Sequence, residues 1–290
     1  ALDGARAEVA ALLRGDPAEV VFTSGGTEAN ALGVLGAIAV ARGRHVVATA
    51  IEHPAVLRNV DALKARGYEV TLVAPGADGI VRSEAVAQVV REETALVAVM
   101  LVNNELGTIQ PVAEIGRAIR ANAPRAHLHV DAVQAMAVLP VDVRALGAST
   151  VALSGHKLHG PKGIGALWVR AGVRLGPLWD GGRQERGLRS GTENLPAAVG
   201  LGRAATIAQR SLGQMATIAT HRDRLESKIL ASLPPARRTV PLESPRAAHI
   251  ASLRFPGLPA EPLLHALEAR GVYVSAGSAC ASKTRGPSHV

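Results

Sequence analysis

Apolar residues along this chain follow two alternating patterns. Short blocks of consecutive apolar residues, many of them β-branched, are typical of buried strands, and longer segments with apolar residues every three or four positions are typical of helices. The blocks predict strands at 19–24, 45–50, 69–74, 95–102, 127–132, 150–155 and 165–170. The periodic segments predict helices at 1–14, 27–43, 54–67, 83–93 and 111–123.

The alternation of strand and helix predicts an α/β fold around a mostly parallel sheet of seven strands. Several blocks, such as 95–102, are apolar at nearly every position, as expected for strands that are covered on both faces. Helices are therefore expected on both sides of the sheet.

The pattern changes in the last third of the chain. The stretch 176–194 is rich in Gly and Arg and predicts a long functional loop, and a long helix follows at 196–230. Beyond a proline-rich linker, the pattern predicts a strand, a helix and a strand, at 249–255, 262–271 and 272–280. We therefore expect a large domain over 1–230 and the start of a smaller α/β domain over 231–290.

Composition and charge exclude several classes of protein. The chain has 290 residues, of which 48% are hydrophobic, so it can bury a sizeable core. No apolar run is long enough to span a membrane, and there is no signal peptide. The net charge is +8, but the basic residues are scattered and aromatic residues make only 2%, which argues against nucleic-acid binding.

Two further features concern the compartment and the chain ends. The single cysteine excludes an internal disulfide and a cysteine-based zinc site, and it fits a reducing compartment such as the cytoplasm. The chain begins with Ala1 inside a predicted helix and ends at 287–290 without a stop signal. We expect both ends to be truncated.

The most informative motif is SGHKLHGP at 154–161. Lys157 lies there just beyond an apolar strand, where an amine can form a Schiff base with an aldehyde cofactor. A solvated lysine is a poor nucleophile, whereas one in a protected site beside a cationic group is a good one. Lys162 is the competitor, and a solvated surface position is the ordinary alternative for either lysine. We favour Lys157 because Ser154 and His156 flank it, and we expect Lys162 to be structural or phosphate-facing.

The motif SGGTEAN at 24–30 separates a strand from a helix. Gly25 and Gly26 let the backbone approach an anion, and Thr27 with the helix N-terminus can donate hydrogen bonds to a phosphate. The alternative is an ordinary glycine turn with a threonine N-cap. No G-K-[ST] follows, so this is not a Walker loop.

The motif HLHVDA places His127, His129 and Asp131 on one face of a strand, because alternate side chains of a strand point the same way. Such a set can ligate a metal, but no further ligand cluster accompanies it, so we expect no metal site. Asp131 is better placed beneath a pyridine ring, where a carboxylate keeps the ring nitrogen protonated and makes the cofactor an electron sink.

Two more candidates are Cys280 and His53. Cys280 stands among small residues in SAGSACAS, which favours an exposed loop carrying a thiol over a buried apolar position. His53 follows a strand at the carboxyl edge of the sheet, where α/β sites form. A capping or packing histidine is the equal alternative for His53.

Together these segments resemble the class V aminotransferase family and, within it, the cysteine desulfurases of the NifS/IscS class. The resemblance covers nearly the whole chain from about residue 20. The matching runs are FTSGGTEAN, EHPAVL, VNNELGTIQPV, HVDAVQA, SGHKLHGPKGIGALWVR, GGRQERGLRSGTEN and SAGSACAS. The resemblance implies the fold type I of pyridoxal-phosphate (PLP) enzymes, with a partly missing C-terminal domain.

The resemblance also implies a role for each matched residue. Lys157 forms the Schiff base with pyridoxal phosphate, Asp131 pairs with the pyridine nitrogen, and Gln134 contacts the phenolic oxygen. His53 stacks on the ring and shuttles protons. Cys280 is the nucleophile that becomes the persulfide.

The remaining matched residues hold the phosphate or reach between subunits. The phosphate is bound by Gly26, Thr27, Ser154 and His156. Asn104 lies near the ring and the substrate. Thr192 reaches the phosphate of the other subunit, so the resemblance implies a homodimer with shared sites.

The implied activity is desulfuration of L-cysteine. The substrate displaces Lys157, the freed amine or His53 removes the α-proton, and the Cys280 thiolate takes the sulfur, which leaves L-alanine. The persulfide then passes to an iron–sulfur scaffold or a tRNA-thiolation enzyme. Family members are longer at both ends, and the arginine that clamps the substrate carboxylate has no counterpart in this chain.

Three other functions compete with this interpretation. An aminotransferase or a selenocysteine lyase shares the fold, but transamination has no need of Cys280. A non-catalytic scaffold binds no cofactor, and the intact Lys157, Asp131 and Cys280 argue against it.

Overall fold

The computed structural model describes residues 1–277 and 288–290, and a seven-stranded sheet forms its centre. The strands are β1 (Val20–Thr23), β2 (His45–Thr49), β3 (Glu69–Val73), β4 (Thr94–Met100), β5 (His127–Asp131), β6 (Thr150–Ser154) and β7 (Gly165–Val169). Their order is β1-β7-β6-β5-β4-β2-β3. Only β7 runs antiparallel to its neighbours, so the predicted mostly parallel sheet is confirmed.

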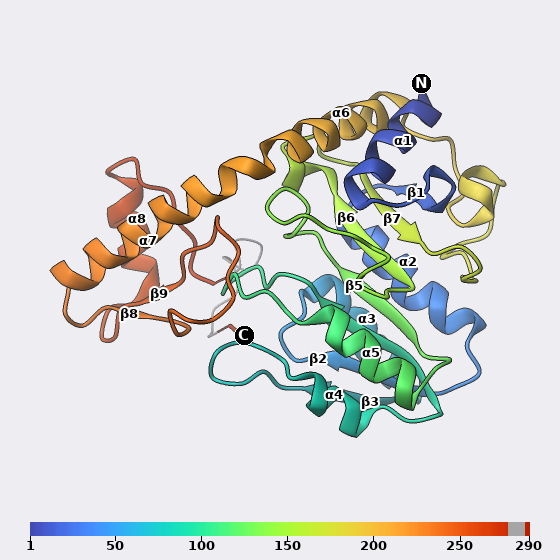
Figure 1. Ribbon diagram of the computed structural model, residues 1–290, viewed down its shortest axis with the longest axis horizontal. Helices are drawn as coiled ribbons and strands as arrows, with labels where there is room; N and C mark the ends of the chain where they lie inside the picture. Colours follow the sequence, from blue (N-terminus) through green and yellow to red (C-terminus); the bar gives the residue numbers. More distant parts are fainter. Residues whose placement is uncertain (278–287) are drawn as a thin grey trace.

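Helices cover both faces of the sheet, as predicted (Figure 1). One face packs against α2 (Gly26–Val40) and α3 (Pro54–Ala65), and the other against α1 (Leu2–Leu13), α4 (Ser83–Val89), α5 (Val112–Asn122) and α6 (Leu195–Ser211). Strand β4 shows why its sequence is apolar throughout. Its side chains alternate between two buried cores, with Leu96 in the core under α2 and Val97 in the core under α5.

The parallel strands bring distant segments of the sequence to one edge of the sheet. Strands β1, β2, β4, β5 and β6 point in the same direction, so the turns that follow them meet at their carboxyl ends. These turns contain the predicted motifs that begin at residues 24, 53, 103, 131 and 154. In open α/β sheets this edge is where ligands bind.

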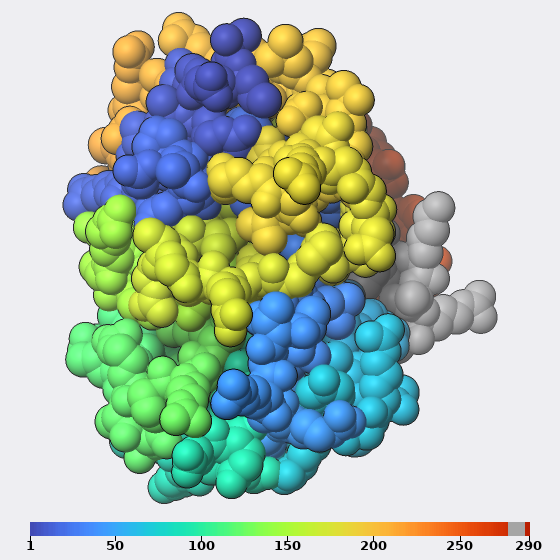
Figure 2. Space-filling view, turned by 90° about the vertical axis from the view of Figure 1, so that its right-hand side faces the viewer, coloured from blue at the N-terminus to red at the C-terminus, as the bar shows by residue number. Residues whose placement is uncertain are grey.

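The long loop 176–194 is fastened to α1, β1 and α2 by buried charged side chains. Both carboxylate oxygens of Glu185 accept hydrogen bonds from Arg6 at 2.7 Å, and Glu185 Oε2 also accepts from the backbone N–H of Phe22 at 2.8 Å. Arg189 Nε donates to Glu28 Oε1 at 2.9 Å, near the start of α2. Figure 2 shows this loop in yellow across the middle of one face, below the dark blue amino-terminal residues.

The carboxyl-terminal part extends away from the sheet on a long helical arm (Figure 1). Helix α6 passes through a 3-10 turn (Leu212–Gln214) into α7 (Met215–Ser232), so the predicted helix at 196–230 is confirmed apart from that turn. A two-stranded ribbon of β8 (Arg237–Arg238) and β9 (Leu253–Arg254) and helix α8 (Ala260–Glu268) follow. The division into domains at residue 230 stays a prediction.

Two expected elements differ from the structure. The strand expected at 249–255 is reduced to the two residues of β9. The strand expected at 272–280 is absent over its described part, 272–277, and the rest lies outside the described residues. Val272 and Tyr273 are 47% and 79% exposed, because no described strand lies beside them to pair with.

No helix in the described part of the chain is both long enough and apolar enough to cross a membrane.

Candidate active site

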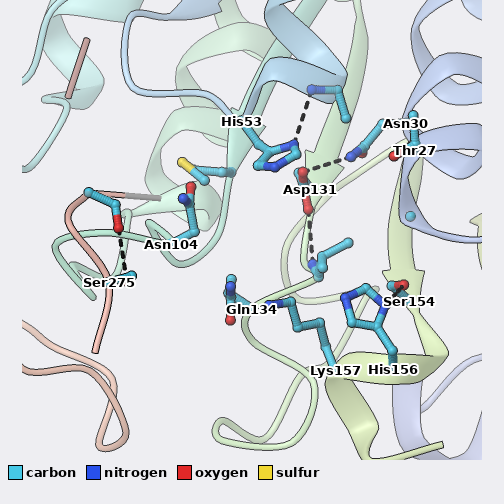
Figure 3. A pocket seen from close by; sticks show the side chains of 15 residues that line it. Thr27, Asn30, His53, Asn104, Asp131, Gln134, Ser154, His156, Lys157 and Ser275 are labelled. Atoms are coloured by element: carbon cyan, nitrogen blue, oxygen red, sulfur yellow. Dashed lines mark hydrogen bonds between the residues drawn. The ribbon is translucent and has the colours of Figure 1, made fainter. Parts of the chain in front are cut away.

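A cavity of about 220 Å³ opens at the carboxyl edge of the sheet, where the motifs meet (Figure 3). Residues from the ends of β2, β4, β5 and β6, from helix α2 and from the segment 275–277 line it. Nine of the predicted site residues are among them: Gly26, Thr27, His53, Asn104, Asp131, Gln134, Ser154, His156 and Lys157.

A short helical turn brings Lys157 to the cavity. Strand β6 ends at Ser154, and a 3-10 turn (Gly155–Leu158) follows at once. His156 Nδ1 lies 2.8 Å from the Ser154 hydroxyl, so these two side chains form one polar group beside the lysine. Lys157 is exposed to the open cavity, whereas Lys162 is not among the lining residues. The structure therefore separates the two competing lysines.

The start of α2 forms the wall next to Ser154. A Cβ added at Gly26 would lie 2.8 Å from Val133 Cγ2 and 3.2 Å from Ser154 Cβ, so only glycine fits this close approach. The N-cap position is Gly25, and no described side chain caps it. The alternative of a threonine N-cap is therefore wrong, since Thr27 lies inside the helix. The first N–H groups of the helix have no intrahelical partner and can bind an anion.

Asp131 lies at the end of β5 and is 5% exposed. Its Oδ1 accepts a hydrogen bond from the backbone N–H of Val133 at 2.9 Å, and its Oδ2 accepts from Asn30 Nδ2 at 2.7 Å. Burial raises the pKa of this carboxyl group, while both hydrogen bonds and the nearby His53 oppose that rise. The two donors hold the carboxylate in one orientation and favour its charged form.

His53 lies both at the start of helix α3 and beside the cavity. It is the N-cap of α3, where its Nδ1 accepts the backbone N–H of Ala55 at 3.0 Å, and it also lines the cavity. Burial lowers the pKa of His53, and Asp131 acts in the opposite direction. Because Nδ1 accepts the hydrogen bond from Ala55, it carries no proton, and the proton of the ring is on Nε2.

The turn after β4 is positioned by buried polar residues that sequence reasoning missed. Asn103 Oδ1 accepts the N–H groups of Glu105 and Leu106 at 2.9 and 2.8 Å, and Asn103 Nδ2 donates to the carbonyl of Ile51 at 3.0 Å. This side chain links the turn that carries Asn104 to the turn that carries His53.

Glu52 is another missed residue at this edge. Its Oε1 accepts hydrogen bonds from the Thr49 hydroxyl and the Met100 N–H, both at 2.6 Å, whereas Oε2 has no partner among the described residues. Glu52 is fully buried, and burial raises its pKa to about 8. It is therefore a neutral acid at pH 7.

The histidines of HLHVDA are used in hydrogen bonds to other side chains. His127 Nε2 and His129 Nδ1 both lie within hydrogen-bond distance of the Thr150 hydroxyl, at 2.7 and 2.9 Å. Among the described residues, no group of His, Cys, Asp and Glu is arranged to hold a metal ion.

Two predicted residues are not brought to the cavity by the described structure. Thr192 is exposed on the long loop and is not a lining residue. Cys280 lies outside the described residues. The chain on both sides of it nevertheless reaches the site, because Ser275 and Gly277 line the cavity and His289 Nε2 lies 2.9 Å from the carbonyl oxygen of Glu52.

The lining also includes residues that were not predicted. They are Asn30, Ala55, Met100, Val133, Ser275 and Gly277. One of them carried a signal in the sequence, because Asn30 follows Thr27 by three positions and so lies on the same face of α2.

The residues of the cavity fit pyridoxal phosphate. The uncapped start of α2, the close approach at Gly26 and the Ser154–His156 pair offer donors to a phosphate. The buried Asp131 carboxylate suits a protonated ring nitrogen, and Lys157 offers an amine to the aldehyde. Each polar part of the cofactor thus has a chemical counterpart on this chain.

Comparison with known proteins gives one consistent family. The aminotransferase class-V pattern matches residues 1–290. A cysteine desulfurase, IscS 1, from Archaeoglobus fulgidus is 41% identical over 100% of this chain and 75% of its own length. A solved structure of a NifS-like protein has a TM-score of 0.88 and 38% identity, and it covers 94% of this chain and 75% of that one. A second structure, SspA in complex with cysteine, has a TM-score of 0.80 and 32% identity over 99% of this chain and 80% of that one.

Proposed function

The chain belongs to the aminotransferase class-V family, and from this premise we infer that it is a pyridoxal-phosphate-dependent cysteine desulfurase. Its substrate is L-cysteine and its products are L-alanine and enzyme-bound sulfur. The observation that carries this function is the convergence of Lys157, Asp131 and the uncapped start of α2 on one cavity. The relatives named cysteine desulfurase supply the reaction that this arrangement performs.

We assign the cofactor contacts to residues of the cavity. Lys157 would attach the aldehyde, Asp131 would pair with the ring nitrogen, Gln134 would contact the phenolic oxygen and His53 would stack on the ring, with Asn104 near the substrate. The phosphate would be held by Gly26, Thr27, Ser154 and His156. The bound cofactor supplies an electron sink that stabilises negative charge at the substrate Cα.

The geometry of His53 supports Lys157 as the residue that removes the α-proton. His53 Nδ1 is occupied by the N–H of Ala55, so the neutral ring carries its proton on Nε2 and donates there. The amine of Lys157, freed when the substrate binds, has a lone pair and reaches the same cavity. Lys157 is therefore the base for the α-proton, and His53 is a donor.

Cys280 is the proposed sulfur acceptor within the chain. Gly277, which precedes Cys280 by three positions in the sequence, lines the cavity and supports this role. Its thiolate forms a bond to the substrate sulfur while the Cβ–S bond breaks. A proton then completes L-alanine, and the enzyme keeps the sulfur as a persulfide.

Mass spectrometry of the cofactor-loaded protein tests these roles. After incubation with L-cysteine and alkylation, we expect the Cys280 peptide to carry one added sulfur. Lys157→Ala should lose both the visible absorbance of the bound cofactor and the added sulfur. The exposed Lys228→Ala on α7 is the matched control and should keep both.

A second variant separates the roles of lysine and cysteine. Cys280→Ala should keep the cofactor absorbance and lose sulfur transfer to an acceptor protein. Persulfide delivery by Cys280→Ala at the wild-type rate would refute the role of Cys280. An aminotransferase would instead leave Cys280 unmodified in the wild-type protein.

We further propose a cytoplasmic homodimer that passes sulfur to an iron–sulfur scaffold or a tRNA-thiolation enzyme. The position of Thr192 supports the dimer, because its side chain is exposed and does not line the cavity of the same chain. Sedimentation equilibrium should give twice the mass of the chain. A monomer with full activity would contradict the proposal of shared sites.

A further inference from the structure

A continuous series of buried hydrogen bonds extends from Asp131 away from the cavity. Asn30 Nδ2 lies 2.7 Å from Asp131 Oδ2, and Asn30 Oδ1 lies 2.9 Å from His129 Nε2. His129 Nδ1 lies 2.9 Å from the Thr150 hydroxyl, which in turn lies 2.7 Å from His127 Nε2. The series joins α2, β5 and β6 behind the carboxylate.

The direction of every bond follows from its end point. A carboxylate only accepts, so Asn30 must turn its NH₂ group to Asp131 and its oxygen to His129. His129 must then donate from Nε2 and accept at Nδ1. The Thr150 hydroxyl donates to that Nδ1 and accepts from His127. All donors therefore point toward Asp131.

The surroundings of His129 keep this arrangement fixed. His129 is fully buried, and a Cβ added at Gly33 of α2 would lie 2.2 Å from its Nδ1, so the helix packs directly on the ring. Burial lowers the pKa of His129 to about 3, and burial together with His129 and Arg170 lowers that of His127 to about 3. Both rings stay neutral, and Nδ1 of His129 can serve as an acceptor.

We propose that Thr150, His129 and Asn30 are positioning residues, which orient the Asp131 carboxylate toward the pyridine nitrogen of the cofactor. This proposal rests on the proposed function, because it assigns Asp131 the ring nitrogen. Thr150 and His129 do not line the cavity, so they act only through Asn30. Loss of the Thr150 hydroxyl leaves Nδ1 of the buried His129 without its donor, and the ring that supports Asn30 is then held less firmly.

The first experiment determines the tautomer of His129 in the protein without cofactor. Nitrogen-15 chemical shifts between pH 6 and 8 should show Nε2 protonated and Nδ1 unprotonated. In Thr150→Val the proton should stay on Nε2, while the Nδ1 resonance should shift because Nδ1 has lost the hydrogen bond from the hydroxyl. A wild-type His129 protonated at Nδ1, or an Nδ1 resonance that is the same in Thr150→Val, would overturn the proposal.

The second experiment measures the affinity for pyridoxal phosphate by titration of its visible absorbance. Thr150→Val should raise the dissociation constant about fivefold, the size of effect expected for a lost hydrogen bond between neutral groups. Thr94→Val is a matched control, because Thr94 is also buried on the sheet and lies 2.9 Å from Nδ1 of the buried His45, far from Asp131 in sequence. It should leave the dissociation constant unchanged.

Replacement of His129 provides a test by rescue. His129→Gln keeps an amide donor near the Nε2 position and should bind the cofactor more tightly than His129→Leu.

Equal binding by Thr150→Val and the wild type would overturn this proposal alone. A wild-type chain that binds no pyridoxal phosphate would overturn the proposed function as well, so the two failures are distinguishable.

Discussion

At the scale of the residue, burial raises the pKa of both acidic groups of the site, and their hydrogen bonds oppose that rise to different extents. Asp131 receives two hydrogen bonds and has His53 nearby, whereas Glu52 receives two but keeps one oxygen without a partner among the described residues. The strand-end position of Lys157, Asp131 and His53 was predictable from sequence. Glu52 was not, since its burial depends on neighbours from β4 that lie about fifty positions away.

The protonation of Glu52 makes the stability of the fold depend on pH. Its folded pKa of about 8 lies above the ordinary value of 4.5, so between these values the folded state binds more protons than the unfolded state. Stability from this group is therefore lost as pH rises from about 5 to 8, by on the order of 1 kcal/mol per pH unit. Glu52→Gln, which mimics the neutral acid, should remove this loss.

Urea unfolding at pH 5.5, 6.5 and 7.5 measures the effect of Glu52→Gln. The free energy of unfolding of the variant, minus that of the wild type, should increase steadily with pH. A difference that is constant over this range would mean that Glu52 does not titrate there.

At the scale of the element, the alternating apolar pattern predicted the seven strands of the large sheet and their helices. It was wrong where apolar residues have no neighbouring strand. Val272 and Tyr273 have a strand-like sequence but are exposed and unpaired within the described chain. It also missed the ion pairs that fasten the loop 176–194, because Arg6 and Glu185 are separated by 179 positions.

Loss of the Glu185 carboxylate should release the long loop. The Glu185 side chain is 1% exposed, so Glu185→Ala leaves Arg6 without its partner and the Phe22 N–H without an acceptor. We expect a loss of about 3–5 kcal/mol in the free energy of unfolding. Glu114→Ala removes an exposed pair with Arg117 and should cost less than about 1 kcal/mol. Equal losses in the two variants would contradict this assignment.

At the scale of the whole molecule, the arm beyond α6 is joined to the turn after β4, next to the cavity. The backbone N–H of Ile109 donates to the carbonyl of Pro245 at 2.9 Å, and that of Ala247 donates to the carbonyl of Gly107 at 2.8 Å. The turn after β4, which carries Asn104, is thus paired with the segment that leads to β9. This contact could not be predicted from sequence, because it joins two irregular segments.

A buried acid holds the same segment to helix α7. Glu226 is 0% exposed and accepts hydrogen bonds from Arg238 and Arg246, at 2.8 and 2.7 Å. Glu226→Ala should leave Arg238 without this carboxylate and Arg246 with only its longer contact to Asp223 at 3.6 Å, and it should speed the cleavage of 233–259 by trypsin several-fold, while cofactor absorbance is retained. Glu261→Ala on the exposed start of α8 is the control and should leave the cleavage rate unchanged. Cleavage of Glu226→Ala at the wild-type rate would show that the pair does not hold the segment.

The central claim is that this chain removes sulfur from L-cysteine. The most direct test is the release of L-alanine from L-cysteine by the protein loaded with pyridoxal phosphate. We predict at least one equivalent of alanine per chain, and none from Lys157→Ala. A protein that binds the cofactor, as judged by its visible absorbance, and yet forms no alanine would contradict the claim.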